Sequence, residues 1–245
     1  MKLKPGHPAL TEARTIHAKR VLPPVVGKIL KPVAANSKVG KGKGTIQKGR
    51  WRGFPLYSVT LEERATCPSD CVRWDTCYGN GMGFAHRFKA GAELEDAILA
   101  ELALLSRMYP HGFVVRLHIL GDFYSVGYVE LWERALRQFP NLNVYGYTAR
   151  DQGIIADALD RIRILFGNRW MVRVSRNKTA GQEPSRIYAS EAGKVPGAIN
   201  CPEQTGKTES CLTCGLCWEI DRTISFIDHD ELQKQRKKNV ETISA

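Results

Sequence analysis

The chain has 245 residues, of which 43% are hydrophobic and 25% are charged, a balance typical of a water-soluble globular protein. No apolar run approaches the roughly 20 residues that cross a bilayer, so we expect no membrane partner. The formal net charge of +11 is strongly basic and favours a polyanionic partner.

The chemistry expected of the seven cysteines depends on whether the protein works in the reducing cytosol or is exported. The amino-terminal sequence MKLKPGHPAL lacks the apolar region of a secretory signal, so we expect a cytoplasmic protein. The cytosol keeps thiols reduced and the number of cysteines is odd, which argues against a disulfide framework. Metal binding therefore becomes the leading interpretation of the cysteines.

The basic charge is concentrated in residues 1–52. This stretch holds thirteen lysines and arginines against one acidic residue, Glu12, whereas the remaining 23 basic and 24 acidic residues nearly cancel. Because a stretch rich in Gly, Lys and Pro buries little apolar surface, we expect a flexible basic arm that contacts the phosphates of nucleic acid. The alternative interpretation is a solubilising tail.

Strands and helices are predicted to alternate after residue 52. Because strands that alternate with helices of this length form right-handed crossovers, the pattern predicts an α/β fold with a parallel sheet. We expect a parallel (β/α) barrel, partial or irregular and similar to a TIM barrel, over residues 53–196. A cysteine-rich carboxyl-terminal insertion follows in 197–245. The predicted strands are 54–61, 113–120, 143–149, 169–175 and 223–229, and the predicted helices are 92–109, 128–139 and 153–166.

The first group of cysteines, Cys67, Cys71 and Cys77, follows the first predicted strand directly. Three thiolates on one short loop can hold a [4Fe-4S] cluster, and the missing fourth ligand would leave one iron open to a substrate or cofactor. Two alternatives stay open. One is a zinc site completed by another residue such as His86, and the other is a set of free structural or redox thiols.

The second group of cysteines is Cys201, Cys211, Cys214 and Cys217. Three thiolates at x2 spacing with a distant fourth repeat the ligand spacing of ferredoxins, whereas zinc ribbons usually bring two separated pairs. This spacing predicts a second [4Fe-4S] cluster, with structural zinc as the alternative. A complete set of four ligands would make this centre structural or suited to passing electrons, and an electron donor would then be a further partner.

Polar residues follow the predicted strands at the ends where parallel α/β folds bind ligands. We take His118, Asp122 and Arg150 as candidate catalytic residues. The candidate cofactor-binding residues are Gly121, Asp122, Thr148, Ser175 and Arg176, and His229 follows the last strand. The alternatives are a simple turn and helix cap for Gly121 and Asp122, a core position for His118, and ion pairs for Arg150, Arg173 and Arg176.

The chain resembles the gene product 88 family, which is found in bacteriophages and in bacterial loci. The resemblance runs from about Asn36 to His229, through the motifs GFPLYSVTLEERATCPSDC, CYG, RLHILGDFYS, YGYTAR and CPEQ...CLTCGLCW. The family itself implies little about function.

A more distant resemblance is to radical S-adenosylmethionine enzymes, which place a three-cysteine loop after the first barrel strand. It implies that Cys67, Cys71 and Cys77 hold the cluster, and that Gly121 and Asp122 meet the amino group of S-adenosylmethionine. The second cysteine gap is five residues here and two in those enzymes. The acidic motif is Gly-Asp-Phe in place of Gly-Gly-Glu.

These observations leave three classes of function. The first is an iron–sulfur enzyme that acts on nucleic acid, with the second cluster as an electron relay. The second is a non-catalytic nucleic-acid-binding protein whose metal sites are structural or sense redox state. The third is a structural protein with zinc at both sites.

Overall fold

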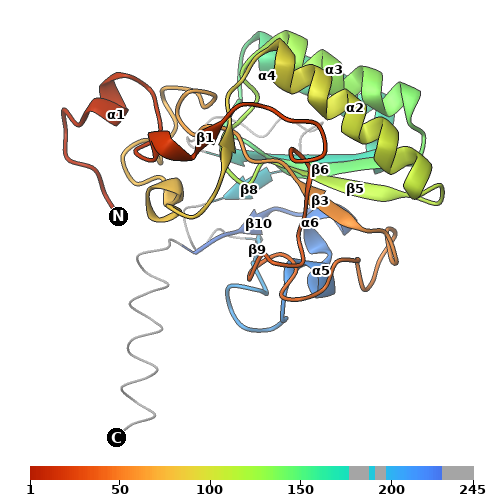
Figure 1. Ribbon diagram of the computed structural model, residues 1–245. Coiled ribbons are helices and arrows are strands. Elements are labelled where there is room, and N and C mark those ends of the chain that lie inside the picture. The colour runs from red at the N-terminus through yellow and green to blue at the C-terminus, as the bar shows by residue number, and fades with distance from the viewer. Residues whose placement is uncertain (177–187, 191–196, 228–245) are drawn as a thin grey trace, which may run out of the picture.

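The structure is a computed structural model that describes residues 1–176, 188–190 and 197–227 (Figure 1). His229 and the side chain of Arg176 lie outside this described part. Within it, no helix has the length and apolar character needed to cross a bilayer.

An open sheet forms the centre of the fold. Every neighbouring pair of strands is parallel except β2 and β3, which are antiparallel. The sheet is therefore mixed, with mostly parallel neighbours. The strands β2 and β9 lie at the two edges among the described residues, so the barrel stays a prediction. In spatial order the strands are β2 (Lys31–Pro32), β3 (Leu56–Ser58), β5 (Phe113–Leu117), β6 (Leu142–Thr148), β7 (Trp170–Arg176), β8 (Tyr188–Ser190), β10 (Ile224–Ser225) and β9 (Ile199–Asn200).

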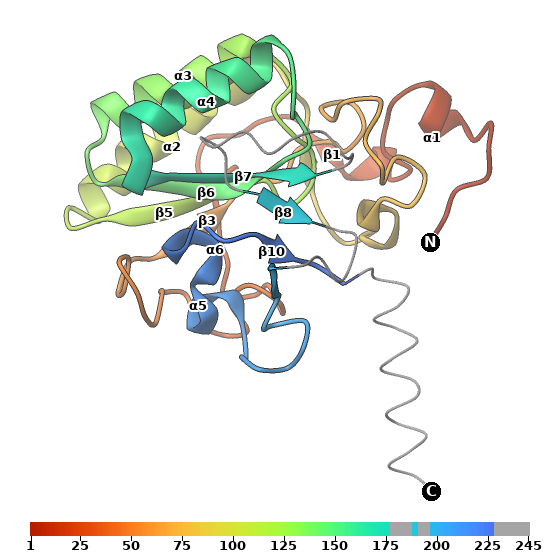
Figure 2. The same ribbon diagram turned by 180° about the vertical axis from the view of Figure 1, so that it is seen from behind.

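Three long helices cover one face of this sheet (Figures 1 and 2). They are α2 (Ala92–Met108), α3 (Val126–Gln138) and α4 (Ile154–Phe166), close to the three predicted ranges. Ser125 begins α3, and its side chain accepts a hydrogen bond from the backbone N–H of Tyr128. The helices bury their apolar side chains against Val115, Leu117 and other residues of the sheet. This face is a conventional helix-on-sheet core.

The opposite face of the sheet is covered by two segments that lie far apart in the sequence, the amino-terminal residues 33–54 and the cysteine-rich residues 201–219. The helices α5 (Cys211–Cys214) and α6 (Leu216–Glu219) belong to the second segment, and both figures place them below the sheet (Figures 1 and 2). The buried cluster on this face contains Val33, Val39, Ile46, Trp51, Leu56, Val114, Tyr145, Met171, Leu212 and Trp218.

The basic stretch 1–52 therefore differs from the expected flexible arm. Val33, Val39, Ile46 and Trp51 of this stretch are buried because the cysteine-rich segment and the sheet supply partners that its own sequence lacks. Trp51, for example, stacks on Trp218 with ring centroids 5.9 Å apart. The rest of the stretch contributes α1 (Pro8–Thr11), a short 3-10 helix η1 (Ala18–Arg20) and β1 (Val21–Leu22), which pairs with β4 (Arg87–Phe88).

A single buried carboxylate attaches the basic stretch to α2. Glu101, which is 4% exposed, accepts hydrogen bonds from the backbone N–H groups of Gly27 at 2.7 Å, Ile29 at 2.8 Å and Leu30 at 2.7 Å. Hydrogen bonds to a charged acceptor are among the stronger ones in proteins. This contact fixes the chain just before β2.

We expect Glu101→Ala to lower the free energy of unfolding by about 2–3 kcal/mol, because the buried N–H groups of Ile29 and Leu30 and the partly buried one of Gly27 lose their acceptor. Urea denaturation followed by circular dichroism measures the change. Glu93→Ala, at an exposed position in the first turn of the same helix, is the matched control and should cost less than about 1 kcal/mol. Equal effects of the two substitutions would contradict the role assigned to Glu101.

Candidate functional site

The three-cysteine loop, residues 67–77, lies beyond the carboxyl end of β3. Cys67, Cys71 and Cys77 are free thiols and all three are partly buried. Burial raises the pKa of Cys67, and the charges of Asp122, Cys71 and Cys77 add to this effect. Asp122, Cys71 and Cys77 are thus the charged neighbours of Cys67, although the three thiols do not gather closely enough to hold a single metal ion. The loop continues into a short 3-10 helix, η2 (Tyr78–Gly81).

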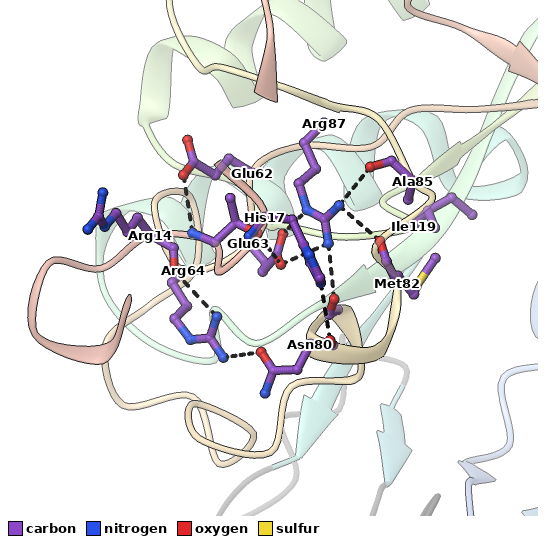
Figure 3. A network of polar contacts seen from close by, with 12 residues as sticks. Arg14, His17, Glu62, Glu63, Arg64, Asn80, Met82, Ala85, Arg87 and Ile119 are labelled. Carbon is purple, nitrogen blue, oxygen red and sulfur yellow. Dashed lines mark hydrogen bonds and ion pairs between the residues drawn. The ribbon is translucent and has the colours of Figure 1, made fainter. Parts of the chain in front are cut away.

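A buried ion pair supports this loop (Figure 3). The guanidinium of Arg87 meets the carboxylate of Glu63, with Nε 2.5 Å from Oε2 and Nη2 3.0 Å from Oε1, and the side chains are 0% and 1% exposed. Arg87 also donates to the carbonyls of Gly79, Met82 and Ala85, so all of its N–H groups are used. The ion pair thereby attaches the segment after Cys77 to the residues before Cys67.

A second arginine holds the loop from its other side (Figure 3). Arg64 donates to the carbonyl of Trp74 within the loop at 2.9 Å and to the side-chain oxygen of Asn80 at 2.6 Å. Thr15, from the amino-terminal stretch, donates its hydroxyl to Glu63 at 2.7 Å. The loop is therefore enclosed by a polar frame that Thr15, Glu63, Arg64, Asn80 and Arg87 provide.

Asp122 joins the ends of two neighbouring strands. It follows β5, it is 4% exposed, and its carboxylate accepts three hydrogen bonds of 2.7 Å, from Phe123 N–H, Thr148 Oγ1 and Ala149 N–H. Its own N–H donates to Thr66 Oγ1, next to Cys67. Burial raises the pKa of Asp122 to about 6, against the lowering effect of these hydrogen bonds and of Arg150.

Gly121 and Arg150 complete the junction. Gly121 has a φ of +85°, and an added Cβ would lie 2.6 Å from both Leu61 Cβ and Thr66 Oγ1, so glycine is required there. Arg150 donates to the carbonyls of Phe123 at 2.9 Å and Thr66 at 3.1 Å. The structure thus brings the candidates Gly121, Asp122 and Arg150 together with Thr148 beside Cys67. Their contacts hold the three-cysteine loop against the sheet.

We expect the stability difference between the wild type and Asp122→Asn to depend on pH. A carboxyl group whose folded pKa is raised favours folding below the unfolded value, near 4, and this advantage is lost as the pH rises through 6. The wild type should lose about 2–3 kcal/mol relative to the variant between pH 4 and pH 7. Urea denaturation at a series of pH values measures this. A pH-independent difference would contradict the buried, weakly acidic Asp122.

The other predicted site residues lie elsewhere. His118 is 4% exposed and packs among aromatic rings, with Nε2 3.1 Å from the hydroxyl of Tyr128. Burial, with a contribution from Arg116, lowers the pKa of His118 to about 3, so the ring is neutral. Ser175 lies near the end of β7. Neither side chain makes a hydrogen bond to the Asp122 junction among the described residues.

The second group of cysteines forms a four-cysteine centre. Cys201, Cys211, Cys214 and Cys217 line one small hollow together with Trp218, Ile224 and neighbouring backbone. Cys201 follows β9, while the other three lie on the short helices α5 and α6. Gly215, with a φ of +78°, ends α5 and lets the chain turn at once into α6. This turn brings the three closely spaced thiols around the same hollow as Cys201.

Positive charges surround the four-cysteine centre. Burial raises the pKa of Cys211 to about 12, and Arg116 and Lys38 oppose this rise. Arg173 and Arg116 likewise oppose the rise at Cys217, whose sulfur accepts a hydrogen bond of 2.9 Å from Tyr147. The carbonyl of Cys217 accepts another from Arg173 at 2.9 Å. These cations favour the thiolate form, but burial outweighs them and raises the pKa of all four thiols, to which Glu203 in the lining of the hollow adds at Cys214.

The donor set fits a thiolate-bound metal group, although the thiols do not form a compact mononuclear site. In the part of the chain that the structure describes, no three His, Cys, Asp or Glu side chains lie close enough together to hold one metal ion. His86, the alternative fourth ligand of the three-cysteine loop, is exposed. Soft thiolate donors of this kind select zinc, copper(I) or iron–sulfur groups.

Several residues of these sites escaped the sequence analysis. Glu63 stands in the charged run Glu62-Glu63-Arg64, which has the pattern of a solvated surface, and its partner Arg87 is 24 residues away. Arg116 occupies an inner strand position in an otherwise apolar stretch. The sequence could have singled out Arg116 because it stands between strongly apolar neighbours, where a charged side chain needs an opposite charge or hydrogen-bond acceptors.

The fold and the two cysteine groups define an α/β protein with an open, mostly parallel sheet and thiol-lined sites around it. Its family is shown by sequence: the model of the family described as Gene product 88 matches residues 29–220, a range that contains all seven cysteines. The chain belongs to the gene product 88 family, as its motifs predicted.

Curated relatives of the chain are phage proteins. The Gene 88 protein of Mycobacterium phage L5 is 27% identical over 126 residues, which cover 45% of this chain and 53% of the relative. The Gene 88 protein of Mycobacterium phage D29 is 26% identical over 127 residues, with the same coverage. The match spans about half the length of these relatives, and no solved structure matches the chain. These matches carry no indication of iron–sulfur or radical S-adenosylmethionine chemistry.

Proposed function

We propose that the protein is an iron–sulfur protein, with one [4Fe-4S] cluster in the four-cysteine centre and a second on the three-cysteine loop. The observation that carries this proposal is the common hollow lined by Cys201, Cys211, Cys214 and Cys217, with cationic side chains around it. A bound cluster would supply one-electron chemistry. The polypeptide would supply the thiolates, their enclosure and the surrounding charge.

The two centres would have different roles because they offer different numbers of protein ligands. Four thiolates close the coordination of a cluster, which suits structure or electron transfer. Three thiolates leave one position for another molecule, and the rigid frame of Glu63, Arg64 and Arg87 would hold that position in place. An electron donor is the partner that such a pair of centres would need.

The more distant resemblance to radical S-adenosylmethionine enzymes implied that Asp122 meets the cofactor. The residues at the three-cysteine loop do not fit that role. The carboxylate of Asp122 is buried, and three donors of the protein itself already bind it. Because the carboxylate is enclosed and already holds the ends of β5 and β6 together, it is poorly placed to meet the ammonium group of a cofactor. We derive no step through S-adenosylmethionine, and Asp122 is better described as the residue that joins β5 to β6.

Anaerobic purification followed by iron and sulfide analysis tests the proposal. We expect about eight iron atoms and eight sulfides per chain, and an electron paramagnetic resonance signal after reduction. Protein purified in this way without iron, or with stoichiometric zinc in its place, would refute the iron–sulfur assignment.

We further propose nucleic acid as the partner of the basic stretch. Eight exposed cations of residues 1–52 take part in no ion pair within the described part of the chain, namely Lys4, Lys19, Arg20, Lys28, Lys31, Lys41, Lys48 and Arg52. Each cation that neutralises a phosphate releases a counterion, which makes binding dependent on salt. Deleting the stretch would remove part of the core, so substitution of its charges is the appropriate test.

We expect Lys41→Glu, Lys48→Glu and Arg52→Glu together to weaken binding to DNA or RNA and to flatten its salt dependence. The slope of log K against log salt should fall by about 3, one unit for each phosphate contact. Lys89→Glu, Arg107→Glu and Arg134→Glu change the net charge equally at exposed positions outside the stretch. If both triple variants weaken binding to the same extent, general charge and not this stretch is responsible.

A further inference from the structure

The guanidinium of Arg116, a partly buried residue, has no hydrogen-bond or ion-pair partner among the described residues. Arg116 lies on β5 between Val115 and Leu117, which face the helices, so its side chain lies on the opposite face of the sheet. Its Nε is buried without a hydrogen-bond partner, and among the described residues Arg116 forms no ion pair. A largely enclosed cation without a partner is unfavourable, so the position favours an anion that the described residues do not supply.

The neighbours of Arg116 identify where that anion lies. Strand register places Arg116 beside Tyr145, whose hydroxyl is also buried and unpartnered in the described structure. Tyr145 belongs to the buried cluster against which Cys211 and Cys217 pack. On the same strand as Tyr145, Tyr147 donates to the sulfur of Cys217. Arg116 therefore lies on the sheet beneath the four-cysteine centre.

The groups around Arg116 leave one source of negative charge. Its electrostatic neighbours are Tyr145, Cys211, Tyr78 and Tyr147, and none of them is a carboxylate. Tyrosines are neutral phenols at neutral pH. Thiols become negative when they bind a metal, because the thiolate is the ligand. Four thiolates around a divalent zinc ion or a [4Fe-4S] core leave a net charge of about −2.

We propose that Arg116 is the fixed counter-charge of the loaded four-cysteine centre, acting as a positioning residue and not as a ligand. This inference rests on the proposed metal binding. It holds for an iron–sulfur cluster and also for a zinc ion, around which the four thiols would have to move closer together than they lie here. Arg173 is a second cation at the centre, but it already donates to the carbonyls of Cys217 and Arg222. Arg116 makes no such contact among the described residues, and Glu203, the carboxylate in the lining of the hollow, is paired with Lys38, so the metal–thiolate group would compensate Arg116.

The experiment uses the full-length chain with Cys67→Ser, Cys71→Ser and Cys77→Ser, so that only the four-cysteine centre can load. Zinc affinity is measured by competition with a chelator. Arg116→Gln should weaken zinc binding at least about tenfold, while Arg116→Lys, which keeps the charge, should retain most of the affinity. After reconstitution with iron and sulfide, Arg116→Gln should shift the midpoint potential to more negative values, because a lost positive charge disfavours the reduced form.

In metal-free protein, the stability should respond to Arg116→Gln in the opposite direction to the metal affinity. Removing an uncompensated buried charge should leave the urea midpoint of metal-free Arg116→Gln at or above that of the parent, whereas a merely structural arginine would lower it. Arg169→Gln, which removes a guanidinium bound to the carbonyls of Leu136 and Phe139, is the control and should not change zinc affinity.

The outcomes separate the two proposals. A parent protein that binds neither zinc nor iron would refute metal binding and this inference with it. A parent that loads normally, with Arg116→Gln of equal affinity and unchanged potential, would refute only the role of Arg116. A metal-free variant that unfolds more easily than the parent would also overturn that role.

Discussion

Cys217→Ser is expected to remove about half of the bound iron and sulfide, and Cys67→Ser the other half. Each substitution deletes a thiolate from one centre only, and serine is a poor ligand for the soft metals that thiolates select. Iron and sulfide analysis of anaerobically purified protein, with the visible absorption spectrum, measures the loss.

Each cysteine variant serves as the control for the other, because both are partly buried cysteines of the same chain. The double variant should contain no cluster. Loss of all iron on either single substitution would indicate a shared site or a folding defect, and the assignment of two independent centres would then be wrong.

Arg87→Met is expected to lower the free energy of unfolding by about 3–5 kcal/mol, because it leaves Glu63 as an uncompensated buried charge. The substitution also removes the donors that bind the carbonyls of Gly79, Met82 and Ala85. Urea denaturation followed by circular dichroism gives the magnitude. Iron loading of the three-cysteine loop should fall as well, since the frame around the loop is lost.

The matched control is Arg137→Met in the surface pair of Arg137 with Glu133. That pair has a comparable distance of 2.8 Å, but Arg137 is 57% exposed. Exposed pairs contribute little, so we expect a loss of at most about 1 kcal/mol. A loss at Arg87 as small as this would mean that water replaces the arginine, which the buried setting of Glu63 argues against.

The parallel layout of the sheet was predictable because its evidence is local. The apolar stripe of Leu94, Ile98 and Leu102 predicts α2 from sequence spacing alone, and all three are buried. In parallel α/β folds, ligands are bound by residues beyond the carboxyl ends of the strands. This rule placed Asp122 and Thr148 at one edge of the sheet, where they form a hydrogen bond. Such features follow from the spacing of neighbouring residues and from the common direction of the strands.

The packing of the basic stretch was not predictable in this way. Val39 and Trp51 follow no helical or strand period, and their partners Leu212 and Trp218 lie far along the chain. The Glu63–Arg87 pair joins two charges that local composition assigns to solvent. Tertiary partners decide both outcomes, and a single sequence does not identify such partners.

The distance in sequence across the four-cysteine centre has a consequence for its biogenesis. Backbone N–H groups of Cys211 and Leu212 donate to the carbonyls of Lys38 and Val39, and Arg50 contacts Glu219, 169 positions later. By contrast, Arg150 is the last residue whose contacts described above hold the three-cysteine loop, through the carbonyl of Thr66. A nascent chain on a ribosome could thus enclose that loop once Arg150 had emerged. The four-cysteine centre would have to wait until residues 201–219 had emerged, so a metal could bind there only after the strands from β3 to β7 had been made.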